Sequence, residues 1–384
     1  MAGPVRHPID GKKLEAYLQQ TVPEIELPLE IKQFGFGQSN PTYQLTAPSG
    51  ARYVVRKKPP GQLVSKTAHK VEREYRILAA LGGTPERARQ TGVPVPRAYC
   101  LCEDPTVIGT PFYVMSFLDG RIIEDPAIPD DAVQHDPAQR RAMWAAAVTS
   151  LARLHRVDPA AVGLATFGKP EGFYKRQVDT WKAICAAQAS TKDKETGLPV
   201  GELPHMDEMM TFFGDAHYQP TDRSTLIHGD YKIDNLVFHK TLPEIIGILD
   251  WEMSTRGHPL SDLLNLLTPF QTAHLAGQIH IGNPLFLPGR LPGLPTLDEI
   301  TAMYAAEAGW TPTASELRWA AAFNIFRLAA ICQGIAARAA SRQASSEAAL
   351  SYAKARVPLA QLAWEMMKDA RGLQCRKDDA QAKL

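Results

Sequence analysis

The sequence predicts an α+β fold with two lobes, a small antiparallel β-rich lobe with one main helix and a larger, mostly helical lobe. Short apolar runs separated by glycine- and proline-rich turns fill the first part of the chain, which is typical of antiparallel strands. Longer segments with helical periodicity dominate the second part, and a β-like region interrupts them. We therefore expect an N-terminal lobe over residues 1–116, a C-terminal lobe over 117–371 and a flexible tail over 372–384.

The first lobe begins with a short amphipathic stretch over residues 12–18 and continues with three expected antiparallel strands. These strands cover residues 31–36, 43–45 and 52–56, where β-favouring residues lie between turn residues. A turn-rich segment with two glycines joins the first two strands. This order predicts a small twisted sheet at the start of the chain.

The main helix of this lobe is expected over residues 65–81, where apolar residues recur at helical spacing. A helical projection places Glu74 in the middle of the apolar face. A carboxylate on a buried face is costly unless it has a cationic partner. Arg56 and Lys57, at the end of the preceding strand, are the nearest candidates in the sequence.

The second lobe follows a buried strand that we expect within residues 111–120 and that emerges into a connector. A proline-rich stretch from Pro284 to Pro295 is expected to form a loop or a lid. The helices of the second lobe are expected over residues 137–155, 173–188, 206–215, 297–308, 314–342 and 347–367.

The β-like region of the second lobe carries the most informative residues. Two short apolar runs, 236–238 and 245–249, are separated by a proline-containing turn, which predicts a hairpin. In an antiparallel hairpin the start of the first strand lies beside the end of the second. The hairpin therefore places Asn235 next to Asp250, and Asp230 lies on the loop just before it.

These three side chains and His228 predict a site for phosphoryl transfer. Oxygen ligands suit Mg²⁺ with bound phosphates. Asp230 and Asn235 are five residues apart, the spacing of the catalytic Asp and the metal-binding Asn in the kinase pattern H-R-D-x-x-x-x-N, with a later Asp as second metal ligand. A polar loop with an Asx turn would explain one of these residues, but not all of them together.

Composition and charge limit the other classes of function. Hydrophobic residues make up 45% and charged residues 22%, as in a globular protein. A net charge of +1 argues against a general nucleic-acid binder, which needs a basic face. The five cysteines lack zinc-like pairs, so we expect free thiols in a reducing compartment. We expect neither a signal peptide nor a membrane span.

The whole chain resembles the aminoglycoside phosphotransferase/choline kinase-like family, which has the two-lobed protein-kinase-like fold. The segment His228-Gly229-Asp230 to Asn235 and the later Leu249-Asp250-Trp251-Glu252 are similar to the catalytic loop and the metal motif of that family. Further segments resemble one branch, the kinase-like domain that is fused to acyl-CoA dehydrogenases in animal homologues. The resemblance runs from about residue 25 to about residue 370, and these further segments are 37–43, 53–61, 73–75, 109–115 and 175–177.

The resemblance implies an enzyme that depends on ATP and Mg²⁺. Asp230 would orient or deprotonate the acceptor hydroxyl. Asn235 and Asp250 would hold Mg²⁺ between the phosphates. Lys232, two residues after Asp230, could neutralise charge on the transferring phosphoryl group, and a solvated loop lysine is the alternative.

The resemblance also implies a nucleotide site in the first lobe. Arg56 would stand where the family has a phosphate-binding cation, paired with Glu74, and Lys57 remains the competing candidate. The turn-rich segment before the second strand would place backbone N–H groups and a hydroxyl over the ATP phosphates. The residues expected there are Gly37, Ser39 and Asn40, and Ser116 and Leu118 would offer backbone groups to adenine.

The acceptor is expected to be a small molecule. Eleven residues separate Asp250 from Asp262, where a further helix is expected to begin, and this leaves no room for a long peptide-binding activation segment. From residue 301 onward, eleven Lys and Arg against seven Asp and Glu favour an anionic substrate over a polycation. Each candidate contact could instead be a surface or core-edge residue; the candidates are Arg176, Gln177, Trp181, Trp251, Glu252 and Arg327.

The last three residues, Ala382-Lys383-Leu384, differ by one residue from the Ser-Lys-Leu peroxisomal address, which a receptor reads at a free carboxyl end. A tail that ends this way by chance is the alternative. We expect a peroxisomal protein that the import receptor recognises, or otherwise a cytoplasmic one, without nucleic-acid or membrane partners.

The resemblance to the domain fused to acyl-CoA dehydrogenases, joined to the peroxisome-like address, implies a kinase that phosphorylates a hydroxyl of a hydroxyacyl-CoA or hydroxy acid in lipid catabolism; no residue in the sequence identifies a CoA site. Three alternatives stay open. They are a detoxifying kinase for an antibiotic or secondary metabolite, a choline-type kinase, and a non-catalytic nucleotide-binding module.

Overall fold

The computed structural model describes residues 2–35, 40–59, 70–133, 135–343 and 346–381, which fall into two compact units. Unit 1 consists of the chain segments Met1–Glu124, Val157–Ala165 and His228–Thr255. Unit 2 consists of Asp125–Arg156, Thr166–Ile227 and Arg256–Leu384. The loop with Asp230 and the hairpin that follows it therefore belong to the same unit as the N-terminal strands.

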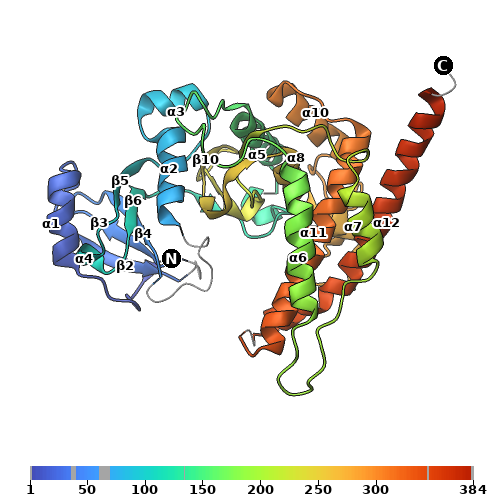
Figure 1. The fold of residues 1–384 in the computed structure, drawn as a ribbon. Helices are drawn as coiled ribbons and strands as arrows, with labels where there is room; N and C mark the ends of the chain where they lie inside the picture. Colours follow the sequence, from blue (N-terminus) through green and yellow to red (C-terminus); the bar gives the residue numbers. More distant parts are fainter. Residues whose placement is uncertain (1, 36–39, 60–69, 134, 344–345, 382–384) are drawn as a thin grey trace. The chain divides into compact units, whose positions relative to one another are not determined.

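An antiparallel six-stranded sheet is the main β-structure in the described part of unit 1 (Figure 1). The strand order is β1-β2-β3-β4-β6-β5. The three strands expected near the N-terminus are present as β2, β3 and β4, and the buried strand expected within 111–120 is β6. The strands are β1 (Ala2–Gly3), β2 (Glu30–Phe34), β3 (Thr42–Thr46), β4 (Arg52–Lys57), β5 (Ala98–Cys102) and β6 (Phe112–Ser116).

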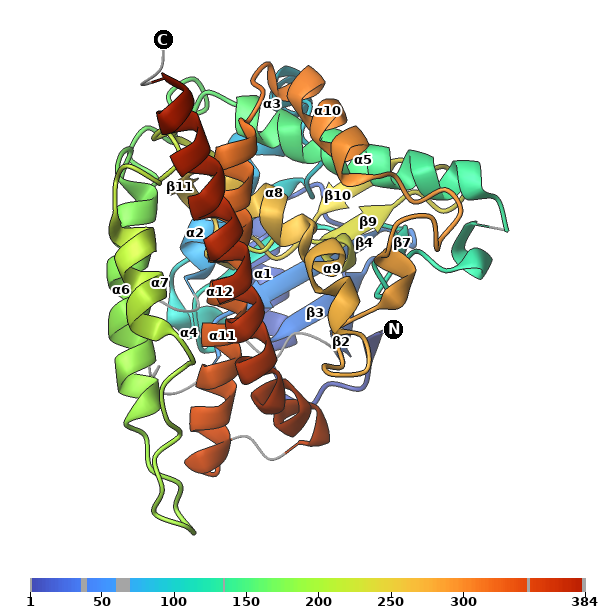
Figure 2. The same cartoon turned by 90° about the vertical axis from the view of Figure 1, so that its right-hand side faces the viewer.

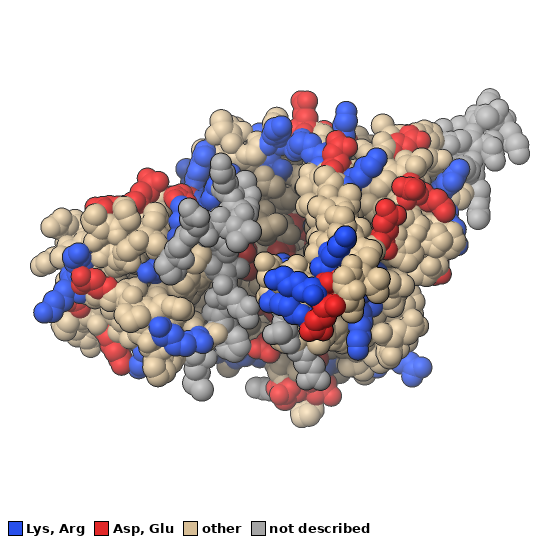
Figure 3. All heavy atoms as spheres, turned by 60° about the horizontal axis from the view of Figure 1, so that its bottom comes forward, with Lys and Arg blue, Asp and Glu red and all other residues tan. Residues whose placement is uncertain are grey.

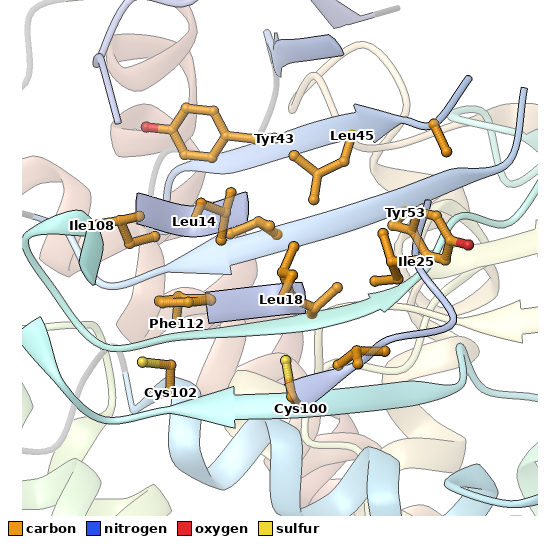
Figure 4. Close-up of a cluster of buried hydrophobic side chains, with 14 residues drawn as sticks. Leu14, Leu18, Ile25, Tyr43, Leu45, Tyr53, Cys100, Cys102, Ile108 and Phe112 are labelled. Carbon is orange, nitrogen blue, oxygen red and sulfur yellow. The ribbon is translucent and has the colours of Figure 1, made fainter. Parts of the chain in front are cut away.

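Helix α1 (Gly11–Thr21) packs on one face of this sheet, and Figure 4 shows its Leu14 and Leu18 among the buried side chains of the strands. Asp10 begins the helix as its N-cap, because its side chain accepts a hydrogen bond from the Lys13 backbone N–H. Leu14 and Leu18 lie one turn apart and are fully buried against the strands. The strand residues of this cluster are Tyr43, Leu45, Tyr53, Val55, Cys100, Cys102, Phe112 and Val114.

Helix α2 (Val71–Gly82) contacts strands β5 and β6. Side chains alternate along a strand, so Tyr113 points to the face opposite its neighbours in β6, which pack with α1. Glu74 on α2 reaches Tyr113 and is buried, as the helical projection predicted. Residues 65–69 of the expected helix lie outside the described residues.

A second, three-stranded sheet in the described part of unit 1 contains the expected hairpin. Its strand order is β10-β9-β7, formed by β7 (Arg121–Ile122), β9 (Leu236–Phe238) and β10 (Ile245–Ile248). The Leu118 side chain fills the space beside Gly247, where an added Cβ would lie 2.0 Å from Leu118 Cδ1. The segment after β6 is therefore packed directly on β10.

Strand β5 is not among the strands predicted from the sequence. It pairs along β6 and has two alternating buried cysteines. Two short helices flank it in the chain, α3 (Pro85–Thr91) and α4 (Pro105–Ile108), and each begins with a proline after a capping side chain.

Unit 2 is mainly helical. Figure 2 shows α11 and α12 side by side, with α6 and α7 packed along them. A two-stranded sheet of β8 (Thr225–Ile227) and β11 (Thr255–Gly257) adjoins these helices in the chain. The helices are α5 (Pro137–Arg156), α6 (Phe173–Ala189), α7 (Met206–Gly214), α8 (Leu260–Leu266), α9 (Thr268–Thr272), α10 (Leu297–Ala308), α11 (Ala314–Ala340) and α12 (Glu347–Gln381).

Helix α11 forms the core of unit 2. Thr313 and Glu316 form a reciprocal capping box at its start, which fixes the first turn. Among the described helices, α11 has the length and apolar composition that could cross a membrane, and 61% of its most apolar stretch is buried in the structure. A buried core helix passes the same test, so this finding is weak evidence for a span.

In unit 2 the proline-rich segment takes one of its two expected forms, and the expectation for the end of the chain changes. The proline-rich segment is a packed loop, because Phe286 contacts Trp144 of α5 and the Pro292 carbonyl accepts a hydrogen bond from Arg140. The expectation of an irregular chain from residue 372 is wrong up to Gln381, where α12 ends. Polar residues such as Lys, Gln and Arg favour helix, and extending an existing helix costs little. Residues 382–384 lie outside the described residues.

The distribution of charged side chains and the state of the described cysteines match what the sequence predicts. Lys and Arg side chains lie among Asp and Glu side chains on the face shown in Figure 3, as a net charge of +1 suggests. Cys100, Cys102, Cys185 and Cys332 are buried free thiols, as expected.

Candidate active site

The hairpin brings Asn235 and Asp250 together as the sequence predicted. Leu236 pairs with Ile248, and the Leu249 N–H donates to the Asn235 carbonyl at 2.9 Å. Asp250 then adopts a left-handed backbone conformation with a φ of 63°, which turns the chain sharply into the next 3-10 turn. Asp is one of the few residues that tolerate this conformation.

The Asn235 side chain also holds the loop that carries Asp230. Its Nδ2 donates to the Asp230 carbonyl at 2.8 Å and lies 3.3 Å from the Asp230 carboxylate Oδ2. Because the amide nitrogen makes both contacts, the Asn235 Oδ1 is the atom that remains for a cation.

His228 fixes the other end of this loop. Its Nδ1 accepts the Asp230 backbone N–H at 3.2 Å, and its Nε2 lies 2.8 Å from the Leu249 carbonyl. A carbonyl only accepts hydrogen bonds, so the proton of the neutral ring is on Nε2. His228 thus links the Asp230 loop to the end of β10.

Lys232 lies beside two carboxylates of the same loop. Its Nζ is 3.6 Å from Asp230 Oδ2 and 3.1 Å from Asp234 Oδ2. Burial alone would lower the pKa of Lys232, but these carboxylates outweigh it and raise the pKa. Lys232 therefore stays protonated at neutral pH next to Asp230.

Arg56 is the cation that pairs with Glu74, which resolves the alternative with Lys57. Its Nε lies 3.1 Å from Glu74 Oε2, and its Nη2 lies 2.8 Å from Asp250 Oδ1. Lys57 points to the other face of β4, where its Nζ donates to the Ile108 carbonyl at 3.1 Å. The expected ion pair is confirmed for Arg56.

Arg56 lies among three carboxylates, of which Asp250 could bind a divalent cation together with Asn235. Three carboxylates lie within 4 Å of one guanidinium, because Glu252 Oε2 is 3.7 Å from Arg56 Nη2 and joins Glu74 and Asp250. Arg56 therefore faces three acidic side chains, and burial raises the pKa of one of them, Glu74, to about 7. The described residues contain no group of three or more His, Cys, Asp or Glu side chains that could hold a metal ion. Mg²⁺ is commonly held by one or two carboxylates together with substrate phosphates, so Asp250 and the Asn235 Oδ1 are suitable protein ligands.

The chain matches the model of a phosphotransferase enzyme family over residues 30–293. This range contains Arg56, Glu74, Asp230, Asn235 and Asp250, the residues that the structure collects in unit 1. The chain belongs to this family.

Longer proteins are also similar to this phosphotransferase. Acyl-CoA dehydrogenase family member 11 of Gallus gallus is 36% identical over 371 residues, which are 94% of this chain and 44% of that protein. Acyl-CoA dehydrogenase family member 10 of Mus musculus is 36% identical over 352 residues, which are 88% of this chain and 29% of that protein. The phosphotransferase spans less than half the length of these relatives.

Solved structures confirm the predicted fold class. A Ralstonia eutropha protein, provisionally named an aminoglycoside phosphotransferase, has a TM-score of 0.79 at 35% identity, over 94% of this chain and 99% of its own. An ethanolamine kinase of Plasmodium vivax has a TM-score of 0.55 at 13% identity, over 91% of this chain and 89% of its own. The second likeness shows the two-lobed kinase-like fold alone.

The structure describes only some of the residues expected to bind the nucleotide. Gly37 and Ser39 lie outside the described residues. The Ser116 N–H donates to the Arg97 carbonyl at 2.9 Å within the sheet, so Ser116 has only its carbonyl to offer adenine. The Leu118 N–H has no hydrogen-bond partner among the described residues, and it remains the donor expected at this position.

Asn40 has a different role from the one expected. Its Nδ2 donates to Glu74 Oε1 at 2.9 Å, and the residue is buried. Asn40 therefore supports Glu74 instead of reaching out to a nucleotide.

The expected substrate contacts on α6 and α11 are partly brought together. Gln177 and Arg327 line one cavity of about 10 Å³ with Ser261 and Asn324, which is the size of a single water. Trp181 donates its Nε1–H to Gln177 at 3.2 Å. The Arg176 guanidinium donates to the Glu171 carbonyl in the loop before α6 and so holds that loop.

Trp251 is a correction. Its ring is buried beside His228, and its Nε1–H donates to the Ile248 carbonyl at 2.8 Å. The turn after the left-handed Asp250 directs it inward, so it is a core residue and not a substrate contact. Its neighbour Glu252 remains in the Arg56 cluster.

A larger cavity of about 420 Å³ lies in unit 2, and no residue predicted for the site lines it. Its lining comes from the loop between α6 and α7 and from the adjoining ends of α11 and α12.

Tyr113 is a site residue that the sequence did not predict. Its hydroxyl donates a hydrogen bond to Glu74. The signal for it is the strand register, which pairs Tyr113 with Arg56 across β4 and β6.

Proposed function

We propose that this phosphotransferase uses ATP and Mg²⁺ to phosphorylate a hydroxyl group on a small molecule, and that the acceptor is a hydroxyacyl-CoA or a related hydroxy acid. The convergence of Asp230, Asn235 and Asp250 in unit 1, beside the Arg56–Glu74 ion pair, carries the proposal. No single structural role would require all five side chains at these positions.

Asp230 is the residue proposed to act on the acceptor. It receives the hydroxyl proton while the hydroxyl oxygen bonds to the γ-phosphorus and the bond from that phosphorus to ADP breaks. Asn235 and Lys232 orient its carboxylate through the contacts at 3.3 and 3.6 Å. The Lys232 charge lies where negative charge on the transferring group can be offset.

The charged groups around Arg56 are the ones proposed to bind the phosphates of the nucleotide and the metal ion. Bound Mg²⁺ would supply positive charge to the phosphate oxygens. Asn235, through Oδ1, and Asp250 are the residues that would hold it. Arg56 would contribute a planar, permanently charged donor for phosphate oxygens, held in place by Glu74.

Two observations support a small anionic acceptor. After Asp250 the chain passes through a 3-10 turn and β11 and enters α8 at Leu260, so the described residues contain no long activation segment there. The longer relatives are named acyl-CoA dehydrogenases, which supports a substrate related to acyl-CoA. A hydroxyacyl-CoA is an anion with a free hydroxyl and satisfies both observations.

The proposal is tested by incubating the protein with Mg-ATP and a panel of acceptors, and by following ADP release and the phosphorylated product. The panel contains hydroxyacyl-CoAs, free hydroxy acids, sugars, amino alcohols and aminoglycosides. We expect turnover of hydroxyacyl-CoAs or hydroxy acids. Turnover of sugars or amino alcohols alone would disprove the proposed acceptor and leave the kinase activity standing.

The Asp230→Asn variant separates catalysis from binding. Loss of the proton acceptor should reduce kcat by about 10²-fold or more, since general base catalysis typically contributes 10²–10⁴. Mg-ATP affinity should stay within a few-fold of the parent value in a calorimetric titration. A parent protein that binds Mg-ATP but phosphorylates none of the acceptors would support a nucleotide-binding module instead.

A further inference from the structure

Glu74 is a buried carboxylate whose two oxygens are both occupied. Oε1 accepts a hydrogen bond from Asn40 Nδ2 at 2.9 Å. Oε2 accepts one from the Tyr113 hydroxyl at 3.0 Å and lies 3.1 Å from Arg56 Nε. Two neutral donors, Tyr113 on β6 and Asn40 just before β3, thus share this carboxylate with one cation.

Glu74 and its two neutral hydrogen-bond donors are buried. Asn40, Glu74 and Tyr113 are each 1% exposed. Burial raises the pKa of Glu74 to about 7, while Arg56 and the hydrogen bond from Tyr113 oppose the rise. A buried charge of this kind needs its remaining lone pairs satisfied by hydrogen bonds, which Asn40 and Tyr113 supply.

The position of Glu74 restrains Arg56 through their ion pair. Because a guanidinium is planar, an ion pair at Nε also restrains where Nη2 can lie. Here Nη2 lies 2.8 Å from Asp250 Oδ1 and 3.7 Å from Glu252 Oε2. Arg56 and Tyr113 face each other across β4 and β6, so both reach Glu74 from the same side of the sheet.

We propose that Tyr113 and Asn40 are positioning residues for nucleotide binding, which hold the Glu74 carboxylate and through it direct Arg56 toward the phosphates. The inference rests on the proposed function in so far as Arg56 binds phosphate. It gives Asn40 the role of holding Glu74 and gives the same role to Tyr113, which has no proposed contact with the reacting groups.

The test compares Tyr113→Phe with Tyr43→Phe. Both tyrosines are buried in the same sheet and both donate a hydrogen bond, since the Tyr43 hydroxyl donates to the His7 carbonyl at 2.7 Å. Tyr43 packs on the α1 side, away from Glu74. Tyr113→Phe should raise the KM for Mg-ATP and the calorimetric Kd about tenfold, because it removes a hydrogen bond to a charged group. The KM for the acceptor should stay unchanged.

The Tyr43→Phe variant should lose a comparable amount of thermal stability and keep the parent affinity for Mg-ATP. Equal effects of the two variants on nucleotide affinity, or no effect of Tyr113→Phe, would overturn the inference. Asn40→Ala should act in the same direction as Tyr113→Phe. Asn40→Asp should be worse, because it places a second negative charge against Glu74.

A crystal structure of the Tyr113→Phe, Asn40→Ala double variant without nucleotide gives a readout that does not depend on activity. We expect the Arg56 Nε to Glu74 Oε2 distance to exceed 4 Å. An unchanged ion pair would overturn the inference even if the parent protein is a kinase. A disrupted pair in a protein that never binds Mg-ATP would instead count against the proposed function.

Discussion

Gly229 is the residue that allows the backbone of the Asp230 loop to take its observed conformation. Its φ is +90°, a conformation that other residues rarely adopt. A Cβ at this position would lie 2.6 Å from the Met253 carbonyl oxygen, which is backbone and cannot turn away. The protein kinases carry Arg at the corresponding position of the H-R-D pattern; here an added side chain would collide with Met253.

Gly229→Ala should therefore reduce stability and displace Asp230. The left-handed strain alone costs about 1–2 kcal/mol, and the collision with Met253 adds to it. Gly50→Ala is the matched control in unit 1, since Gly50 has a φ of +85° and nothing within 4 Å of an added Cβ. Urea unfolding should show a larger loss for Gly229→Ala, and kcat should fall only in that variant. Equal losses would show that the contact with Met253 is unimportant.

Residue types and spacing are enough to predict Asp230, Asn235 and Asp250 as neighbours. In an antiparallel hairpin the start of the first strand always lies beside the end of the second. The choice between Arg56 and Lys57 needed the register of β4, since adjacent residues of a strand face opposite sides. Tyr113 depends on the pairing of β4 with β6, which a pattern within one strand does not contain.

Helix α1 illustrates how an element stabilises unit 1 at a distance from the site. Leu18 is fully buried in the cluster of Figure 4, on the side of the sheet opposite Tyr113 and Glu74. Leu18→Ala should lower the free energy of unfolding by about 2–5 kcal/mol, through lost burial and the cavity it leaves. Gln19→Ala on the exposed side of α1 should change it by less than about 0.5 kcal/mol.

Chemical denaturation measures both α1 variants. At temperatures where Leu18→Ala is still folded, its KM for Mg-ATP should equal that of the parent. A change in KM would mean that α1 influences the arrangement of Arg56, and would contradict a purely stabilising role for the helix.

The sequence predicted the long helices of unit 2 and the first strands of unit 1, because repeated periodicity and turn residues mark them clearly. It missed β5, which is short, contains two cysteines and becomes a strand through pairing with β6. It also predicts too early an end for α12, because polar composition alone does not distinguish a solvated helix from an irregular tail.

For the molecule as a whole, Mg²⁺ and ATP together should stabilise the folded state. A ligand at one hundred times its Kd adds about 2.7 kcal/mol to the unfolding free energy. The increase in Tm should require both components, because in the proposed site Asn235 and Asp250 would hold the metal and Arg56 would bind the phosphates. Chelating Mg²⁺ with EDTA should remove most of the increase in a thermal melt.

The variant Asp250→Asn should abolish the Mg²⁺-dependent part of this increase. Asp119→Asn is the control, since Asp119 is an exposed carboxylate of unit 1 that pairs with Arg52 and Lys240 outside the site. An increase in Tm with ATP and EDTA that equals the one with Mg-ATP would argue against a metal at Asp250.

Unit 1 is assembled from chain segments that are made at different times during synthesis. Arg56 and Asp250 form a direct contact across 194 residues of sequence. A ribosome that has released only the six-stranded sheet has therefore not yet made the Asp230 loop or the hairpin. Contacts between such distant residues form late and slow folding. Until residue 255 has emerged, Arg56 therefore lacks Asp250 and Glu252, although Asn40 and Tyr113 are already available to Glu74.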